Sequence, residues 1–140
     1  MRIFLDTNVW ASALMGHGLC RDLLDRIVID HAVLLGDPVR EELHRVLRSK
    51  FRVPAHLWRE LEVKLRDFEQ VPSATIPLNA PSIDADDVIV LACALAARPD
   101  AFVTGDKALL KIGEIESVPI ISPRHLWQRL AGRGEQESST

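Results

Sequence analysis

Two aspartates in this sequence come after short apolar runs, at places where a parallel sheet carries its functional groups. Asp6 follows residues 3–5, and Asp106 follows residues 101–104 after a single glycine. Such runs are typical of strands buried on both faces, and ligands bind at the carboxyl ends of such strands. If the two strands are neighbours, the carboxylates start about 5 Å apart and could share a cation. An aspartate after a strand is also a common helix N-cap or turn residue, and that alternative stays open for each one taken alone.

A third acid, Glu42, belongs to a helix expected from residue 38 onward. At about 100° per residue, Glu42 falls on the border of the apolar face of this helix, whereas Glu41 points to solvent. A carboxylate on that border loses hydration unless a positive group meets it. A metal cation would supply this group, and so would a salt bridge to Arg40 or Arg45. The sequence leaves both open.

Three further acids, Asp84, Asp86 and Asp87, crowd the start of a helix expected over residues 88–97. The helix dipole favours each negative charge there by about 0.3–1 kcal/mol, and capping explains one or two of the acids. Acids this close repel one another and take up protons unless a divalent cation is present. Oxygen ligands without a His or Cys cluster select Mg²⁺ or Mn²⁺ over Zn²⁺. The acidic residues together therefore predict a magnesium or manganese site.

The elements that must position these acids alternate between strand and helix. Apolar runs predict strands at residues 3–5, 33–35, 101–104 and 118–121. The last is expected at an edge of the sheet, because Pro119 cannot donate to a central ladder. Helical spacing predicts helices over residues 9–14, 19–28, 38–47, 54–68, 88–97 and 107–111 and after Pro123, with Asp37 as an N-cap. Strands that alternate with helices imply a parallel sheet covered on both faces.

Length and composition favour one compact domain. The chain has 140 residues, is 47% hydrophobic and carries a formal net charge of −3, so it lacks the strongly basic balance of many DNA-coating proteins. We expect a domain over residues 1–131 and a loose polar tail over residues 132–140. No apolar run approaches the roughly 18 residues that span a bilayer, and no secretory signal is evident. Cys20 and Cys93 fall in apolar helical patterns and are expected to be buried free thiols, which points to the cytoplasm.

Other chemistries have weaker support in the sequence. The histidines show no HxxxH or HExxH spacing, and there is no CxxC, Gly-rich phosphate loop or GxSxG motif. A phosphatase of the haloacid-dehalogenase type also begins with a strand and an aspartate. That chemistry requires a second aspartate two residues later, where this chain has Asn8. A catalytically inactive interaction module that retains an acidic pocket is a further alternative.

Several blocks of sequence together resemble the PIN-domain family, in particular the VapC-like toxins of bacterial toxin–antitoxin pairs. The blocks are residues 4–9 (FLDTNV), 41–47, 84–97, 103–110 (VTGDKALL) and 118–123. The resemblance implies a three-layer α/β/α sandwich with a central parallel sheet, in which the strands that precede Asp6 and Asp106 are adjacent. It also implies that the fold extends over residues 1 to about 130.

The resemblance implies a catalytic and metal-binding set of four acids: Asp6, Glu42, Asp87 and Asp106. Asp87 is preferred to Asp86 because the family's small residues, five and seven positions further on, then fall on Ala92 and Ala94. Asn8 and Thr104 resemble the polar residues that hold the water and carboxylates of the site, and Asp86 stands beside them as a supporting acid.

Family members are typically Mg²⁺- or Mn²⁺-dependent ribonucleases, which implies hydrolysis of RNA phosphodiester bonds by the toxin of a toxin–antitoxin pair. The resemblance further implies a cognate antitoxin as a protein partner and a homodimer. Basic side chains near the acids are candidates for holding the RNA backbone: Lys107, Arg45 and Arg48. A solvated charged face is the alternative explanation for the basic run on the third helix.

Overall fold

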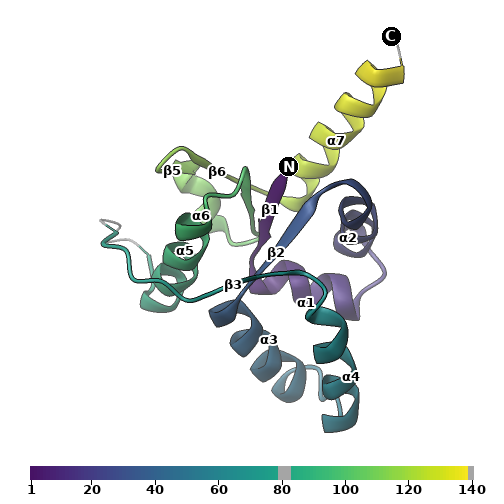
Figure 1. The fold of residues 1–140 in the computed structure, drawn as a ribbon, viewed down its shortest axis with the longest axis vertical. Helices are drawn as coiled ribbons and strands as arrows, with labels where there is room; N and C mark the ends of the chain where they lie inside the picture. Colours follow the sequence, from purple (N-terminus) through teal and green to yellow (C-terminus); the bar gives the residue numbers. More distant parts are fainter. Residues whose placement is uncertain (79–82, 139–140) are drawn as a thin grey trace.

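The structure, a computed structural model, describes residues 1–78 and 83–138, the last six of these by their backbone alone. Its centre is a mostly parallel sheet of six strands in the order β3-β2-β1-β4-β6-β5 (Figure 1). The strands are β1 (Arg2–Leu5), β2 (Ala32–Gly36), β3 (Glu69–Val71), β4 (Ala101–Val103), β5 (Glu114–Ile115) and β6 (Val118–Ile121). Only β5 runs antiparallel to its neighbour. The predicted α/β class with a central parallel sheet is confirmed.

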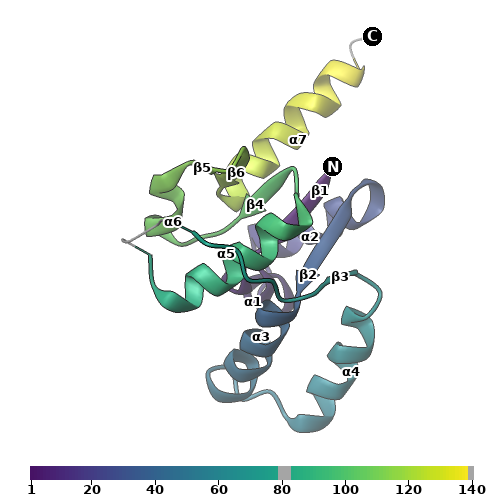
Figure 2. The same cartoon turned by 60° about the vertical axis from the view of Figure 1, so that its left-hand side comes forward.

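Helices cover both faces of this sheet. They are α1 (Thr7–Met15), α2 (Leu19–Asp30), α3 (Asp37–Ser49), α4 (Ala55–Leu65), α5 (Ala85–Ala97), α6 (Lys107–Ile112) and α7 (Pro123–Ser138). In Figure 1 and Figure 2, α1 and α2 lie on one face of the sheet and α5 and α6 on the other, whereas α3 and α4 extend beyond the ends of β1 and β2 that lead into α1 and α3. The helix α7 contacts α2 and extends away from the rest of the molecule. The predicted three-layer sandwich is therefore confirmed.

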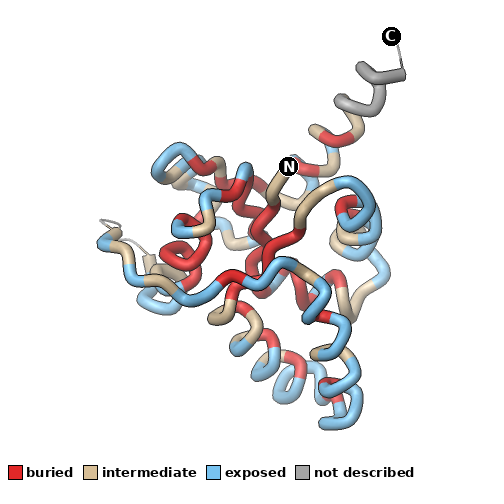
Figure 3. Tube along the Cα trace, in the orientation of Figure 1, coloured by how far each residue is buried: buried red, intermediate tan, exposed pale blue. Residues whose placement is uncertain are grey.

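Buried residues gather along the central strands (Figure 3), and their aromatic and aliphatic side chains form the core. Phe4 of β1 stacks on Phe102 of β4, with ring centroids 5.5 Å apart. Trp10 of α1 meets the Phe68 ring edge-on at 4.9 Å. Each fully buried aromatic or aliphatic side chain of this kind stabilises the fold by about 1.5–3 kcal/mol relative to exposure. These contacts hold β1 and β4 rigidly, so the residues that follow the carboxyl ends of these strands have a fixed starting position.

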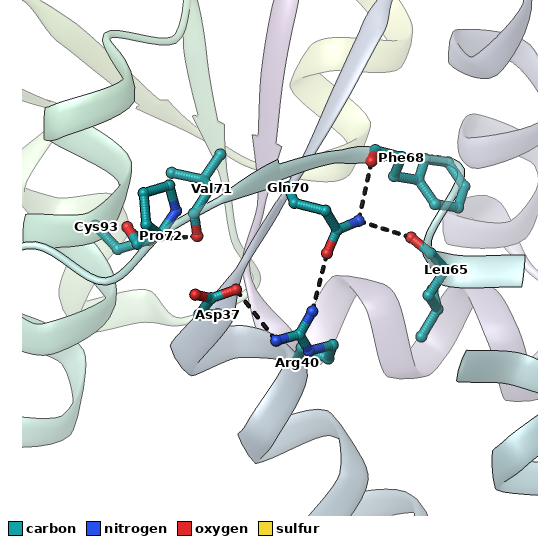
Figure 4. Close-up of polar contacts among 8 residues, drawn as sticks. All are labelled: Asp37, Arg40, Leu65, Phe68, Gln70, Val71, Pro72 and Cys93. Atoms are coloured by element: carbon teal, nitrogen blue, oxygen red, sulfur yellow. Dashed lines mark hydrogen bonds and ion pairs between the residues drawn. The ribbon is translucent and has the colours of Figure 1, made fainter. Parts of the chain in front are cut away.

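A set of polar contacts fastens the edge strand β3 to α3 and α4 (Figure 4). The Gln70 side chain donates from Nε2 to the carbonyl oxygens of Leu65 and Phe68, both at 2.9 Å. Its Oε1 accepts from Arg40 Nη1 at 3.0 Å, and Arg40 Nη2 pairs with Asp37 at 3.2 Å. One side chain of β3 therefore joins the end of α4 to the first turns of α3.

The structure corrects two local predictions. Asp37 is the first residue of α3, not its N-cap; the N-cap is Gly36, and the Asp37 carboxylate pairs with Arg40 instead. The strand β6 is not at the edge of the sheet, because β5 pairs with its outer side and places Glu114 opposite Pro119. Pro119 is tolerated there because its neighbour Ile120 donates the backbone hydrogen bond, to Gly113 at 2.8 Å.

Two terminal and edge features also differ from the sequence-based expectation. Over residues 71–82 the three prolines favour loop with at most a short strand, and the short strand β3 forms slightly earlier, over Glu69–Val71. The backbone continues as α7 to Ser138, although Gly132 and Gly134 each cost a helix about 1 kcal/mol relative to alanine. The domain boundary at residue 131 stays a prediction.

Cys93 is buried as expected, whereas Cys20 is only half-buried. No helix in the described part of the chain is long and apolar enough to cross a membrane.

Candidate active site

The strand order reverses between β1 and β4, and the aspartates that follow these two strands lie at that switch point. The strands pair in parallel with Leu5 opposite Val103. The amide of Asp6 donates to the Val103 carbonyl at 2.9 Å, so β1 and β4 stay joined up to the acid itself. The prediction that the strands leading to Asp6 and Asp106 are neighbours is confirmed. In open α/β sheets the crevice outside a switch point is the usual place for a ligand.

Asp6 is held in a fixed orientation by two donors. Its carboxylate is almost buried, with 7% of the residue exposed. Oδ1 accepts from the amide of Thr7 at 2.8 Å, and Oδ2 accepts from the Thr104 hydroxyl at 2.7 Å. Burial raises the pKa of Asp6, the two hydrogen bonds oppose that rise, and the charges of Glu42 and Asp106 add to it. Asp6 therefore faces two other acids from a position that water barely reaches.

Thr104 connects Asp6 to Asp106. Its hydroxyl is fully buried and accepts from the Asp106 amide at 3.0 Å, so its single proton is directed to Asp6. Asp106 Oδ1 accepts from the amides of Ala108 and Leu109 at 2.8 and 3.3 Å and caps α6. Asp6 caps α1 in the same way, through Thr7. The N-cap role that the sequence left open is therefore real for both aspartates, and the caps fix where their carboxylates point.

Asn8 ties the loop after β4 to the start of α1. Its Oδ1 accepts from the Gly105 amide at 3.2 Å, between Thr104 and Asp106 in the chain. The side chain is exposed, unlike that of Thr104. Asn8 therefore restrains the loop that carries Asp106 from the solvent side of the site.

Asp87 joins the group from α5. It is half-buried in the first turn of that helix, and its pKa is raised to about 6. Burial is the largest cause; the charges of Asp106, Asp6, Asp84 and Glu42 follow in that order. Like charges act this way only at short range, so the four predicted acids lie near one another at the carboxyl edge of the sheet. Asp86, by contrast, is exposed.

Glu42 reaches the same region from α3. It is half-buried, as its place on the border of the apolar face predicted. Arg40, one of the two arginines that could have neutralised it, is held by Asp37 and Gln70. Among the described side chains, those of residues 1–78 and 83–132, no ion pair joins Glu42 to a cationic group. The salt-bridge alternative therefore finds no support in the described structure.

Comparison with known proteins places this fold. The sequence of residues 2–108 matches the PIN domain. The chain belongs to the PIN-domain family. Among solved structures it is similar to the crystal structure of VapBC2 from Rickettsia felis bound to a DNA fragment from their promoter, with a TM-score of 0.64 at 17% identity over 87% of this chain and 98% of that one. At this identity the likeness shows the fold alone. No curated protein matches the sequence.

The chemistry of the PIN-domain acids fits a hard divalent cation. Every candidate ligand is a carboxylate, the donor that Mg²⁺ and Mn²⁺ prefer, and neither His nor Cys joins the set. Across the described ranges, however, no group of three or more His, Cys, Asp or Glu side chains is arranged to hold a metal ion. The four carboxylates stand near enough to repel one another through space but are not drawn into a cage. Carboxylates that repel one another are expected to close together only around a positive charge.

The three basic candidates of this PIN domain have different surroundings. Lys107 is exposed and directly follows Asp106 at the start of α6. Arg45 is exposed on α3. Arg48 donates to the carbonyl of Val53 at 2.8 Å, which helps to hold the connection between α3 and α4. Arg48 therefore has a structural role that its charge alone did not indicate.

Two residues outside the predicted set of four acids also contribute to the site. The amide of Thr7 is one of the two donors to Asp6. Every residue except proline has a backbone amide, so residue type does not reveal such a donor; the only signal is the preference of aspartate for N-caps. Asp84 adds to the charge around Asp87 although it makes no capping hydrogen bond with its side chain. The crowding of three acids at this helix start was the available signal.

Proposed function

We propose that this PIN-domain chain is a Mg²⁺- or Mn²⁺-dependent ribonuclease that hydrolyses RNA phosphodiester bonds. The observation that supports this most is the gathering of Asp6, Glu42, Asp87 and Asp106 near the switch point of the sheet, where burial and the charges of the neighbouring acids raise the pKa values of Asp6 and Asp87. None of the described ion pairs joins these four carboxylates to a basic side chain. A divalent cation would offset their charge, and the negative charge of a phosphodiester substrate requires a cation too.

Each acid has a distinct part in the proposed site. Asp6, Asp87 and Asp106 hold the cation or cations, and Glu42 completes the second position or orients the attacking water. A divalent cation, when bound, supplies a water of lowered pKa and neutralises charge on the phosphoryl oxygens. Thr104 keeps the Asp6 carboxylate pointed at the site through its 2.7 Å hydrogen bond, and near-complete burial keeps bulk water from the Asp6 side. Hydrolysis leaves a 5′-phosphate and a 3′-hydroxyl.

The RNA backbone is proposed to bind across the rim of the acidic site. Lys107 and Arg45 are exposed, and Lys107 directly follows Asp106. Cations placed beside an acidic metal site can contact the phosphates on either side of the scissile bond and offset the net negative charge of the chain. Arg48 is the weaker candidate because it is already bound to a carbonyl oxygen.

We also propose that the chain is the toxin of a toxin–antitoxin pair, acts on RNA in the cytoplasm and forms a homodimer. The support is the resemblance of its sequence blocks to VapC-like toxins and the structural likeness to VapBC2. Apolar side chains that a lone domain leaves in water are consistent with protein partners: Ile29 of α2 is 77% exposed and Val63 of α4 is 59% exposed. A cognate antitoxin and a second copy of the chain are the expected partners.

Cleavage of RNA by purified protein tests the proposed activity. Wild type and Asp6→Asn would be incubated with a mixed RNA pool and 5 to 10 concentrations of Mg²⁺ or Mn²⁺, with EDTA as a blank. We expect Asp6→Asn to lose activity by about 100-fold or more, since removing one charged group at a site of this kind costs several kcal/mol. Asp25→Asn, an exposed acid of α2, is the matched control and should keep full activity. Equal rates for wild type and Asp6→Asn would reject the proposal.

Two further assays on the same purified protein distinguish the proposed ribonuclease from the two alternative functions. Calorimetric titration with Mn²⁺ beside the cleavage assay detects a catalytically inactive module, which would bind the ion and turn over no RNA. A small phosphate ester offered as substrate detects the haloacid-dehalogenase-like alternative. The proposed ribonuclease should bind the ion, cleave RNA and leave the ester intact.

A further inference from the structure

Gly36 stands between two elements of the site and needs its small size for reasons other than backbone conformation. It is the last residue of β2 and the N-cap of α3. Its φ of −76° and ψ of 144° are extended values that any residue adopts. A turn or a positive φ therefore does not explain glycine at this position.

The space around Gly36 does explain it. A Cβ built on this residue would lie 2.9 Å from Cys93 Sγ and 2.9 Å from Phe4 Cζ, closer than real Cβ contacts allow. The glycine therefore lets the start of α3 sit directly against a side chain of α5 and a side chain of β1.

Neither obstacle can move aside at low cost. Phe4 is fully buried and stacks on the ring of Phe102. Cys93 is also fully buried, and its Sγ lies 3.4 Å from the Pro72 carbonyl oxygen and 3.7 Å from that of Val71 (Figure 4). Interiors packed at this density transmit a displacement instead of absorbing it, so an added methyl group would shift α3.

The three elements that meet at Gly36 carry three of the four acids. Phe4 lies in β1, which leads directly into Asp6, and Cys93 lies in α5, which carries Asp87 in its first turn. The helix that begins after Gly36 carries Glu42. A shift of α3 away from β1 and α5 therefore changes the distance from Glu42 to both aspartates.

We propose that Gly36 is a positioning residue of the acidic site: by lacking a side chain it sets how closely Glu42 approaches Asp6 and Asp87. The proposal rests on the proposed function only in that the acids are taken to bind a divalent cation. It assigns no contact with substrate to Gly36. A misplacement of about 1 Å in such a site can cost about 100-fold in rate, so a single methyl group is a large perturbation here.

The chain offers a closely matched control in Gly18, the N-cap of α2. Its φ is −97° and its ψ is −153°, its cap also lacks a side-chain hydrogen bond, and a Cβ built on it meets nothing within 4 Å. Gly36→Ala and Gly18→Ala therefore make the same chemical change at the same kind of helix cap. They differ in whether the new methyl group has room.

The two variants would be compared with wild type by Mn²⁺ calorimetry, thermal unfolding and crystal structures. We expect Gly18→Ala to bind Mn²⁺ as wild type does. Gly36→Ala should remain folded, bind Mn²⁺ at least about tenfold more weakly and show a longer distance from Glu42 to Asp6 in its crystal structure. Adding Cys93→Ala to Gly36→Ala removes one of the two obstacles and should restore part of the affinity.

Unchanged Mn²⁺ affinity and an unchanged distance in Gly36→Ala would overturn the inference. So would unfolding of both Gly36→Ala and the double variant, since Gly36 would then serve the core and not the site. The crystallographic distance also decides the case if wild type binds no Mn²⁺. Failure of the proposed function is detected separately, as the absence of RNA cleavage by wild type.

Discussion

Replacing Asp87 by asparagine should stabilise this protein at neutral pH when no divalent cation is present. Burial and the neighbouring acids raise the pKa of Asp87 from 3.8 in a free aspartate to about 6 in the folded chain. Below pH 3.8 the carboxyl of Asp87 is protonated in both the folded and the unfolded chain, and its contribution to the free energy of unfolding is fully favourable. This contribution is lost as the pH rises through about 6, because the folded chain must then hold a charge that it disfavours. Asp87→Asn carries no charge at any pH. It should therefore equal wild type in stability near pH 4 and exceed it above pH 7.

The size of this effect follows from the pKa. Each unit of pKa difference corresponds to about 1.4 kcal/mol, so a rise from 3.8 to about 6 gives an upper limit of about 3 kcal/mol. Asp87 is only half-buried, and solvent screening reduces the expected gain to about 1 kcal/mol. The dipole of α5 acts in the opposite sense, by about 0.3–1 kcal/mol, because it favours a negative charge in the first turn. The expected net stabilisation by Asp87→Asn at neutral pH is therefore at most about 0.7 kcal/mol.

Urea unfolding followed by tryptophan fluorescence measures this difference, since Trp10 and Trp58 are buried. Wild type, Asp87→Asn and Asp86→Asn would be unfolded between pH 4 and 8 in EDTA. Asp86 is the exposed neighbour in the same turn, so Asp86→Asn controls for the loss of one charge from the helix start. An Asp87→Asn protein that is less stable than wild type at pH 7.5, or whose difference from wild type does not shrink toward pH 4, would refute the reasoning.

Two further substitutions have definite expected outcomes. Thr104→Val removes a buried hydroxyl that donates to Asp6 and accepts from the Asp106 amide. The free energy of unfolding should therefore fall by about 1–3 kcal/mol, and the affinity for Mn²⁺ should fall with it, whereas Thr104→Ser should stay close to wild type. Equal urea midpoints for the two variants would contradict this expectation. Ser117→Gly should raise the free energy of unfolding by about 0.5–1 kcal/mol, because Ser117 is held at a φ of 70° between β5 and β6. A lower melting temperature for Ser117→Gly would show that this strain is absent.

The layers of the fold could be predicted because each depends on a local pattern. Short apolar runs closed by a polar residue gave β1, β2 and β4, and helical spacing gave the helices between them. The predictions that were wrong concern strands whose pairing depends on residues distant in the chain. Pro119 indicates an edge strand only if nothing else pairs outside it, and β5 is too short, at two residues, to leave a pattern. The strand β3 forms because β2 offers it a ladder, not because residues 69–71 favour extended structure.

The acids of the site were predicted unequally well for the same reason. Asp6 and Asp106 were placed at one edge from the ends of their strands, and the pairing of β1 with β4 confirms that neighbourhood. Periodicity places Glu42 on the border of the apolar face of its helix, but it does not show which residues of other elements lie next to Glu42. Which of the acids before α5 faces the others depends on how that helix lies across the sheet. Gly36 gave no signal at all, because only the assembled core shows what its missing side chain leaves room for.

The two halves of the acidic site are held by different forces. Asp6 and Asp106 are helix N-caps whose carboxylates accept hydrogen bonds from residues one to three positions further along the chain, and Asp6 also accepts one from Thr104 on the neighbouring strand end. Such bonds form with the helix itself and survive small shifts of other elements. Glu42 and Asp87 project from the sides of α3 and α5, so their positions relative to the caps depend on how these helices pack. The PIN-domain site thus combines a pair of N-capping acids with a pair placed by helix packing. Packing changes far from any carboxylate should therefore alter the proposed cation binding mainly through the second pair.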